Sequence, residues 1–181
     1  MKFHLAGLLI AALTITAWSQ KPPAGWKVLS QANYTIQYPA NWTLDQSGSQ
    51  SLAFMIHTEL TSLNDPFREN VDLIIQDLRG TTIYLNKYVK MSEEKLGTIL
   101  NNFKIVESTR MNDHRGEFHK LIFTGDVQSI SGSDANLKLK FEQYIWVKGI
   151  KAYVLTFHAE VNQFDTYKVE GEKILNSFKI K

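Results

Sequence analysis

The sequence contains no cysteine among its 181 residues. This absence excludes disulfide bonds, thiolate metal ligands and a cysteine nucleophile, and it excludes the acylated cysteine of a bacterial lipoprotein. A chain of this length with 44% hydrophobic and 12% aromatic residues can bury a core that needs no disulfide support. We therefore expect a soluble, self-sufficient domain.

The chain also lacks an excess of charge of either sign. It has 20 basic and 18 acidic residues, a net charge of +2, and the basic residues are scattered along the sequence. A protein that binds nucleic acid or an anionic membrane through charge needs a basic patch or stripe. The composition therefore predicts no nucleic-acid partner.

The well-marked catalytic motifs are missing as well. The sequence has no nucleophile elbow, no phosphate-binding loop, no dinucleotide-binding glycine pattern and no His-Glu-x-x-His zinc motif. The four histidines beyond the N-terminal segment stand at no diagnostic spacing from a serine or an acid, so we interpret them as structural. The chain is predicted not to be an enzyme. A hydrolase whose catalytic residues meet only in the fold is the least favoured alternative.

Residues 1–19 have the pattern of a secretory signal peptide. A basic residue precedes the apolar run 5–17, and the small residues Ala17 and Ser19 predict cleavage before Gln20. The run is shorter than the ~20 apolar residues that a membrane-spanning helix needs. We expect export to the periplasm or the medium, and no membrane insertion after cleavage.

The mature chain is expected to be one domain. Residues 20–25 form a polar leader that contains Pro22, Pro23 and Gly25, residues that oppose helix formation. No internal repeat and no second domain boundary follows. A single domain is therefore predicted for residues 26–181.

Alternating apolar and polar residues predict a β-rich domain. Residues 26–29 and 34–38 are expected to form a hairpin that Pro39 ends, because proline cannot donate a ladder hydrogen bond. Trp42 is expected to fold back as an apolar plug on the sheet that the long helix covers. Further strands are predicted at 52–56, 71–75, 103–108, 110–111, 117–124, 136–147 and 150–159.

Two segments change to helical spacing. Apolar residues recur at intervals of three and four from Ile83 to Phe103, which predicts a long helix with one face on a sheet. A closing helix is predicted with Asn162 as its N-cap and Asp165 in the capping-box position. Gly171 lies on the apolar stripe of that helix, where it would permit close approach to the sheet. The fold class is α+β.

The order of these elements resembles the PsbP and Mog-type superfamily, which includes DcrB-like periplasmic proteins. The likeness covers about residues 26–181 and is marked by a Tyr-x-Ile-x-Tyr-Pro-x-x-Trp corner at 34–42 and the closing Ile-Leu-Asn-Ser-Phe at 174–178. It implies an antiparallel β-sheet sandwiched between helices, an α/β/α arrangement. PsbP is an extrinsic subunit of the oxygen-evolving complex and Mog-type proteins are partners of a small GTPase, so the resemblance implies a role without catalysis. No functional residue of the family carries over.

The longest irregular segment of the first half, residues 59–69, supplies one set of candidate binding residues. Loops often carry function because a rigid scaffold positions them. The carboxylates supply oxygen ligands of the kind that hard cations prefer. The candidates are Asp65, Arg68, Glu69 and Asp72.

A second set of candidates lies across one predicted turn and the start of the next strand. Asp113, His114, Glu117 and His119 offer mixed nitrogen and oxygen donors for a divalent metal such as Ca²⁺, Mn²⁺ or Zn²⁺. Glu117 and His119 share a strand face, but the spacing matches no Ca²⁺ loop. For both sets of candidates the alternative is a solvated charge cluster, which is typical of turns. No cofactor other than such a metal is predicted.

The leading hypothesis is an exported, non-catalytic, PsbP-like binding or assembly module. It would hold a protein partner or an envelope component with a sheet face or with the loops at 64–70 and 129–134. The alternative is a divalent-metal-binding periplasmic protein. The sequence predicts no oligomeric state.

Overall fold

The computed structural model of the protein describes residues 22–63, 65–128 and 136–181. The signal peptide predicted at 1–19, the first two residues of the leader and the loop predicted at 129–134 lie outside the described residues. The elements, in chain order, are β1 (Trp26–Ser30), β2 (Tyr34–Pro39), β3 (Thr43–Asp45), the 3-10 turn η1 (Ser49–Ser51), β4 (Phe54–His57), β5 (Asn70–Asp77), α1 (Leu85–Ile99), β6 (Asn101–Asp113), β7 (Gly116–Gln128), β8 (Asn136–Lys148), β9 (Lys151–Glu160), α2 (Phe164–Ser177) and β10 (Lys179–Ile180).

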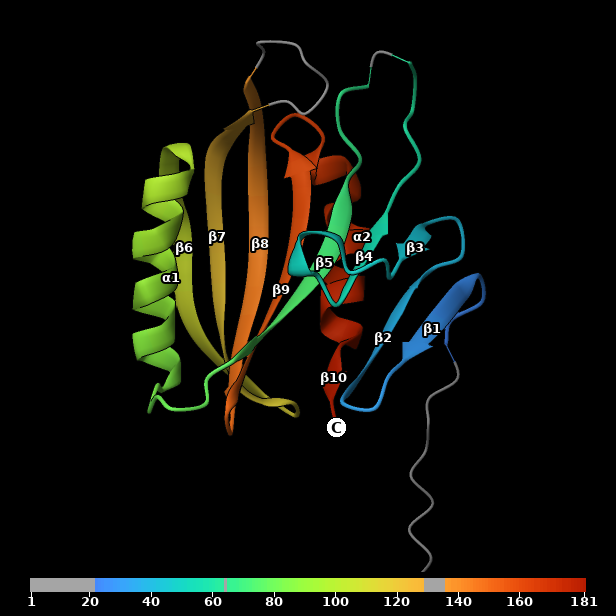
Figure 1. The fold of residues 1–181 in the computed structure, drawn as a ribbon. Coiled ribbons are helices and arrows are strands. Elements are labelled where there is room, and N and C mark those ends of the chain that lie inside the picture. The colour runs from blue at the N-terminus through green and yellow to red at the C-terminus, as the bar shows by residue number, and fades with distance from the viewer. Residues whose placement is uncertain (1–21, 64, 129–135) are drawn as a thin grey trace, which may run out of the picture.

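The strands form two antiparallel sheets (Figure 1). The large sheet has the order β3-β4-β5-β9-β8-β7-β6, and the small sheet has the order β1-β2-β10. The predicted N-terminal hairpin is therefore present, but it belongs to the small sheet and pairs there with the two residues that follow α2. The α+β class, with a large antiparallel sheet and two helices, is confirmed.

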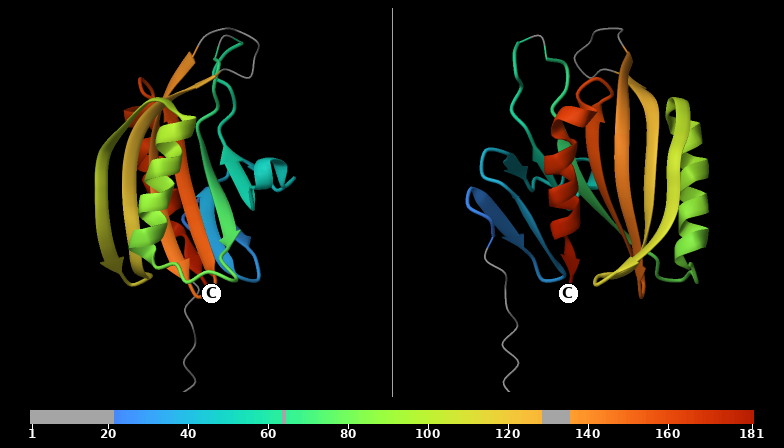
Figure 2. Two further views of the ribbon diagram at one scale, coloured as in Figure 1. Left: turned by 60° about the vertical axis from the view of Figure 1, so that its left-hand side comes forward. Right: turned by 180° about the vertical axis from the view of Figure 1, so that it is seen from behind.

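The main hydrophobic core lies between the large sheet and α2. Figure 2, in the view from behind, shows α2 in front of the large sheet. Alternate residues of β5 and β9 pack there against the apolar stripe of α2. Trp42 also belongs to this core, and its ring contacts Tyr167 of α2 at 6.4 Å between centroids. The prediction that Trp42 packs under the long helix was wrong. The long helix is α1, whereas Trp42 packs against α2 in the other core. The fully buried members on β5, β9 and α2 are Val71, Leu73, Leu155, Phe157, Ala159, Phe164, Ile174 and Leu175.

The helix α1 covers the β6–β7–β8 end of the sheet with a separate set of residues. Leu85, Tyr88 and Val89 pack with Ile145 and Val154, which alternate along their strands with residues of the α2 core. Successive side chains of a strand point to opposite faces, so the two cores use different residues of the same strands.

The long helix ends earlier than predicted. It stops at Ile99, whereas the apolar spacing predicted a helix to Phe103. The backbone is already extended at the C-cap residue Leu100, and β6 begins at Asn101. Asn102 has φ of 52°, in the left-handed region that asparagine tolerates better than most residues. Phe103 still faces the core, with its ring 5.6 Å from that of Phe123, which explains why it extended the helical pattern.

The start of the closing helix also differs from the prediction. Its N-cap is Gln163, not Asn162, and no side chain caps it through a hydrogen bond. Asp165 lies instead in the first turn, where a negative charge interacts favourably with the helix dipole. The two strand segments predicted at 103–111 are one long strand, β6, interrupted by bulges, and β10 was not predicted.

Gly171 is confirmed as a point of close approach. A Cβ atom at this position would lie 2.7 Å from Cγ of the buried Phe157 ring. We expect Gly171→Ala to lower the free energy of unfolding by about 1–3 kcal/mol, because the added methyl overpacks the core. Urea denaturation measures this change. Gly97→Ala on α1 is the matched control, since its Cβ would meet Phe103 at an ordinary 3.5 Å, and equal stability of the two variants would contradict the prediction.

Candidate binding groove

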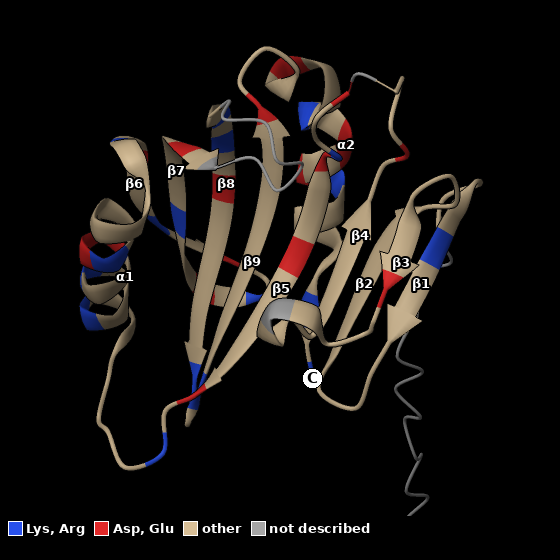
Figure 3. Cartoon of the chain, turned by 45° about the horizontal axis from the view of Figure 1, so that its top comes forward, with Lys and Arg blue, Asp and Glu red and all other residues tan. Residues whose placement is uncertain are grey.

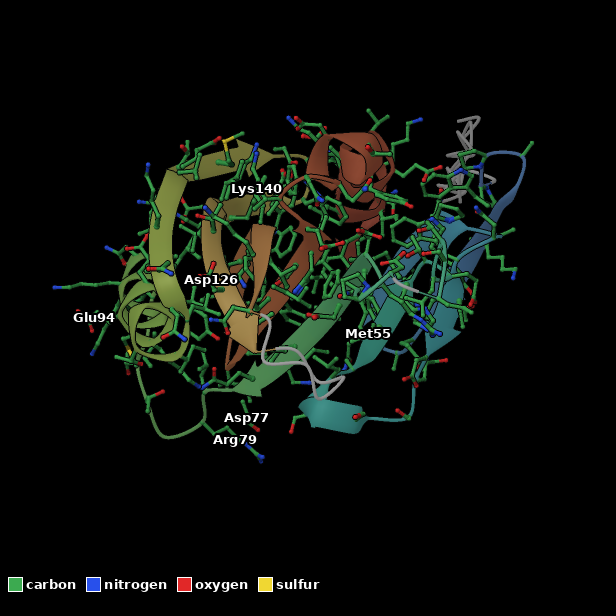
Figure 4. The ribbon with its side chains drawn as sticks, turned by 90° about the horizontal axis from the view of Figure 1, so that it is seen from above. Met55, Asp77, Arg79, Glu94, Asp126 and Lys140 are labelled. Carbon is green, nitrogen blue, oxygen red and sulfur yellow. The ribbon has the colours of Figure 1, made fainter. Side chains whose placement is uncertain are left out.

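A groove of about 700 Å³ lies on the face of the large sheet that carries α1. Its floor crosses β5, β9, β8 and β7, and its sides come from α1 and from the segment before β5. In the view from above, Met55 on β4 and Asp126 on β7 lie on either side of β5, β9 and β8 (Figure 4). The apolar lining consists of Met55, Pro66, Phe67, Ile74, Leu96, Ile99, Leu100, Phe123, Val127, Leu137, Leu139 and Phe141.

Five polar residues form a continuous patch in this apolar surface, and we call them the polar floor: Asn70, Asp72, Gln143, Thr156 and His158. The strand register brings them together. Asn70 pairs with His158, and Asp72 pairs with Thr156 across β5 and β9. Gln143 pairs with Thr156 across β8 and β9. The patch therefore spans three neighbouring strands in the middle of the sheet.

The polar floor is only partly satisfied by its own contacts. Gln143 Nε2 donates to Thr156 Oγ1 at 2.9 Å, and Asn70 Nδ2 donates to the carbonyl oxygen of Arg68 at 2.8 Å. Asn70 Oδ1 is buried and has no hydrogen-bond partner among the described residues. Buried polar atoms are normally paired, so an unpaired acceptor beside a groove indicates a place for a ligand atom.

The central contact of the floor is between Asp72 and His158. His158 Nε2 lies 2.9 Å from Asp72 Oδ2, yet the same nitrogen makes no hydrogen bond of acceptable geometry. We treat the contact as an electrostatic one whose atoms are close but poorly aligned. The His158 ring is held from the side by Phe141, with centroids 5.0 Å apart.

The first set of predicted site residues is divided between two places. Asp72 lies on the polar floor, whereas Asp65 and Glu69 line a separate hollow of about 240 Å³ together with Glu160. Burial raises the pKa of Glu69, and the neighbouring acids Asp65 and Glu160 raise it further. Arg68 is exposed. Along an extended chain, positions three apart point to opposite faces, which separates Glu69 from Asp72.

The second set of predicted residues is held by neighbouring groups. Asp113 pairs with Arg115 at 2.6 Å, and this contact lowers the pKa of Asp113. Glu117 pairs with Arg110 at 2.6 Å. His119 lies 2.8 Å from the hydroxyl of Ser108, and burial lowers its pKa. His114 lines a small pocket beside Trp146.

These pairings do not bring the four predicted metal ligands together. Across the described ranges of the chain, no group of three or more histidine and acidic side chains is placed to hold a metal ion. Figure 3 shows acidic and basic residues interspersed over helices and strands. The divalent-metal alternative stays a prediction that this arrangement does not favour.

Of the polar floor, the sequence indicated Asp72 alone. The other floor residues could have been found from polar residues that interrupt apolar strands. Asp72 lies between Val71 and Leu73, and Thr156 lies between Leu155 and Phe157. A polar side chain in a strand that is buried on both faces needs a partner.

The comparisons with known proteins show the fold and leave the family open. No protein-family model matches the sequence, and no match to a curated protein was found. Cyanobacterial PsbP (CyanoP) from Synechocystis sp. PCC 6803 is similar in structure, with a TM-score of 0.62 and 13% identity over 87% of this chain and 94% of that one.

Two further solved structures are similar. LpqN of Mycobacterium tuberculosis, involved in cell envelope biogenesis, has a TM-score of 0.57 and 14% identity, with 86% of this chain and 90% of LpqN covered. The Ran-binding protein Mog1p of Saccharomyces cerevisiae has a TM-score of 0.53 and 8% identity, with 86% and 95% covered. The chain has the PsbP/Mog-like fold, as the resemblance implied. In the part of the chain that is described, neither helix is long and apolar enough to cross a bilayer.

Proposed function

We propose that this protein is an exported, non-catalytic binding module that holds a small apolar molecule of the cell envelope in the groove. In this proposal the sheet, sandwiched between α1 and α2, is the rigid support of the site. The observation that carries the proposal is the groove itself. A volume of about 700 Å³, apolar walls and a few convergent polar groups are typical of small-molecule sites, which span ~300–1,000 Å³.

The polar floor supports a binding role over a hydrolytic one. A nucleophile needs a base within hydrogen-bond reach. His158 contacts Asp72, but the nearby hydroxyl of Thr156 accepts a hydrogen bond from Gln143. Nε2 of His158 has no hydrogen bond to a hydroxyl group of the described residues. The floor therefore has an acid and an imidazole without a nucleophile that they would activate.

Export is supported by the N-terminal segment, which has the pattern of a signal peptide. The cell-envelope role in the description of LpqN fits the same location. The Ran-binding role of Mog1p supports a protein partner as the alternative occupant. The size of the groove favours a small molecule, because stable protein interfaces bury ~800 Å² on each partner and are flatter than this groove.

Filling the groove is expected to abolish binding of an apolar probe. The probe is N-phenyl-1-naphthylamine, a neutral molecule that fluoresces when it leaves water. Ile74 is 39% exposed and lines the groove, so Ile74→Trp adds bulk there without disturbing the buried core. We expect this variant to bind the probe at least about tenfold more weakly, which corresponds to ~1.4 kcal/mol.

Val169→Trp is the matched control for this experiment. Val169 is exposed on α2, on the opposite side of the sheet from the groove. Fluorescence titration should give the same dissociation constant for this variant as for the unmodified protein. Equal weakening by both substitutions, or none by either, would contradict binding in the groove.

A further inference from the structure

Two side chains of the groove floor, Asp72 and Asn70, present acceptor oxygens to the groove. The amide nitrogens of Asn70 and Gln143 are already bonded to Arg68 and Thr156. The carboxylate of Asp72 and the unpartnered Oδ1 of Asn70 face the groove as acceptors, and His158 Nε2, 2.9 Å from Asp72 Oδ2, is the other floor atom without a hydrogen bond to the described residues. Asp72 and Asn70 are both more than nine-tenths buried. Such acceptors are satisfied by a ligand that brings donors.

The charge of the groove also favours a ligand that donates hydrogen bonds. Among the described residues that line it, Asp72 and His158 are the titratable ones, and none is a lysine or arginine. The walls around them are apolar, and a low local dielectric strengthens electrostatic interactions. A ligand carboxylate would therefore meet Asp72 with no lysine or arginine of that lining to neutralise it. An ammonium group would meet a carboxylate partner.

We infer that the groove selects amphipathic molecules whose polar end donates hydrogen bonds, and that it prefers an amine over a carboxylate on the same apolar chain. The inference rests on the proposed function and adds the class of ligand to it. Asp72 would accept from the ligand's ammonium or hydroxyl group, Asn70 would accept a second hydrogen bond, and the apolar walls would cover the chain.

Three ligands that share the same alkyl chain and differ in the head group measure the head-group preference separately from burial of the chain. Dodecylamine, dodecan-1-ol and dodecanoate are each titrated against N-phenyl-1-naphthylamine at about pH 7.5, where the amine is cationic and the acid anionic. We expect the amine to compete at least about tenfold better than dodecanoate, with the alcohol between them, because a hydrogen bond to a charged group is a strong one.

The outcomes distinguish the inference from the proposed function. Competition by dodecanoate at the strength of the amine, or above it, overturns the head-group inference and leaves groove binding intact. If the unmodified protein binds neither the probe nor any of the three ligands, the proposed function fails and the inference fails with it.

Asp72→Asn tests the assignment to one residue, since it removes the charge and keeps the shape. We expect the advantage of the amine over dodecanoate to fall about tenfold, while the affinity for the alcohol changes less than about threefold. The control is Asp77→Asn on the same strand, which Figure 4 shows beside Arg79, its ion-pair partner at 2.7 Å. An amine preference that survives Asp72→Asn overturns the assignment. The comparison of the three ligands on the unmodified protein needs no variant, so it holds if Asp72→Asn lowers stability.

Discussion

Replacement of Phe178 with alanine is expected to lower the free energy of unfolding by about 3–5 kcal/mol, the usual cost of removing a buried aromatic side chain. Phe178 is fully buried and ends α2. Its ring lies 5.7 Å from Tyr34 of the small sheet and 5.4 Å from Trp146 of the large sheet, measured between centroids. The side chain therefore joins both sheets to α2, and the cavity left by alanine would open at their junction.

The change is measured by urea denaturation followed through tryptophan fluorescence, since Trp146 contacts the deleted ring. Val169→Ala, at an exposed position of the same helix, should change stability by less than about 0.5 kcal/mol. A loss below about 1.5 kcal/mol for Phe178→Ala would show that the two sheets hold together without this side chain.

The part played by Phe178 explains why the end of the sequence was informative. The run from Ile174 to Phe178 was part of the resemblance to PsbP and Mog-type proteins, and the structure shows its apolar members, Ile174, Leu175 and Phe178, fully buried in one core. Local spacing predicted most strands and both helices, because apolar residues at a period of two or near 3.6 identify the buried face of each element.

Element ends were predicted less well, for local reasons. Phe103 kept the helical spacing although the backbone is extended from Leu100 onward, so the pattern alone predicted too long a helix. Trp42 was correctly predicted to be buried, yet its contact with Tyr167 depends on how α2 returns over the sheet. The spacing of apolar residues shows which face of an element is buried, but it does not show which other element covers that face.

The groove could not be predicted because its parts are distant in sequence. Asn70 and Asp72 come from β5, Gln143 from β8, and Thr156 and His158 from β9, and strand pairing alone aligns them. Asp72 was selected for its carboxylate as a companion of Asp65 and Glu69, but the alternation of the strand places it on the other face.

Another buried acid, Glu142, lies on the face of β8 opposite to the groove. The side chain is fully buried, Lys120 Nζ lies 3.4 Å from its Oε1, and the Tyr144 hydroxyl donates to the same oxygen at 3.3 Å. Oε2 has no hydrogen-bond partner within the described residues. Burial raises the pKa of Glu142, and the positive charge of Lys120 opposes that rise. The positive charge of Lys120 therefore offsets part of the free-energy cost of burying the Glu142 carboxylate.

Lys120→Met is expected to lower the free energy of unfolding by about 2–4 kcal/mol at pH ~8. Removing one partner of a buried ion pair costs ~3–5 kcal/mol, and the partial exposure of Lys120, 21% of its side chain, reduces that figure. The methionine keeps most of the apolar stem, so the change reports the charge. Lys138→Met, at an exposed position of β8, is the control and should be nearly neutral.

The loss should depend on pH, and the direction follows from the raised pKa of Glu142. Above the unfolded value of ~4.3, the folded state binds a proton more tightly than the unfolded state, so stability falls as pH rises. Without Lys120 the folded pKa rises further, and the range of pH over which stability falls becomes wider. Urea denaturation at pH ~5, ~6.5 and ~8 should therefore show a difference between variant and unmodified protein that is smallest at the lowest pH. A difference that is constant over this range would mean that Lys120 stabilises the fold through the packing of its methylenes and does not act by neutralising Glu142.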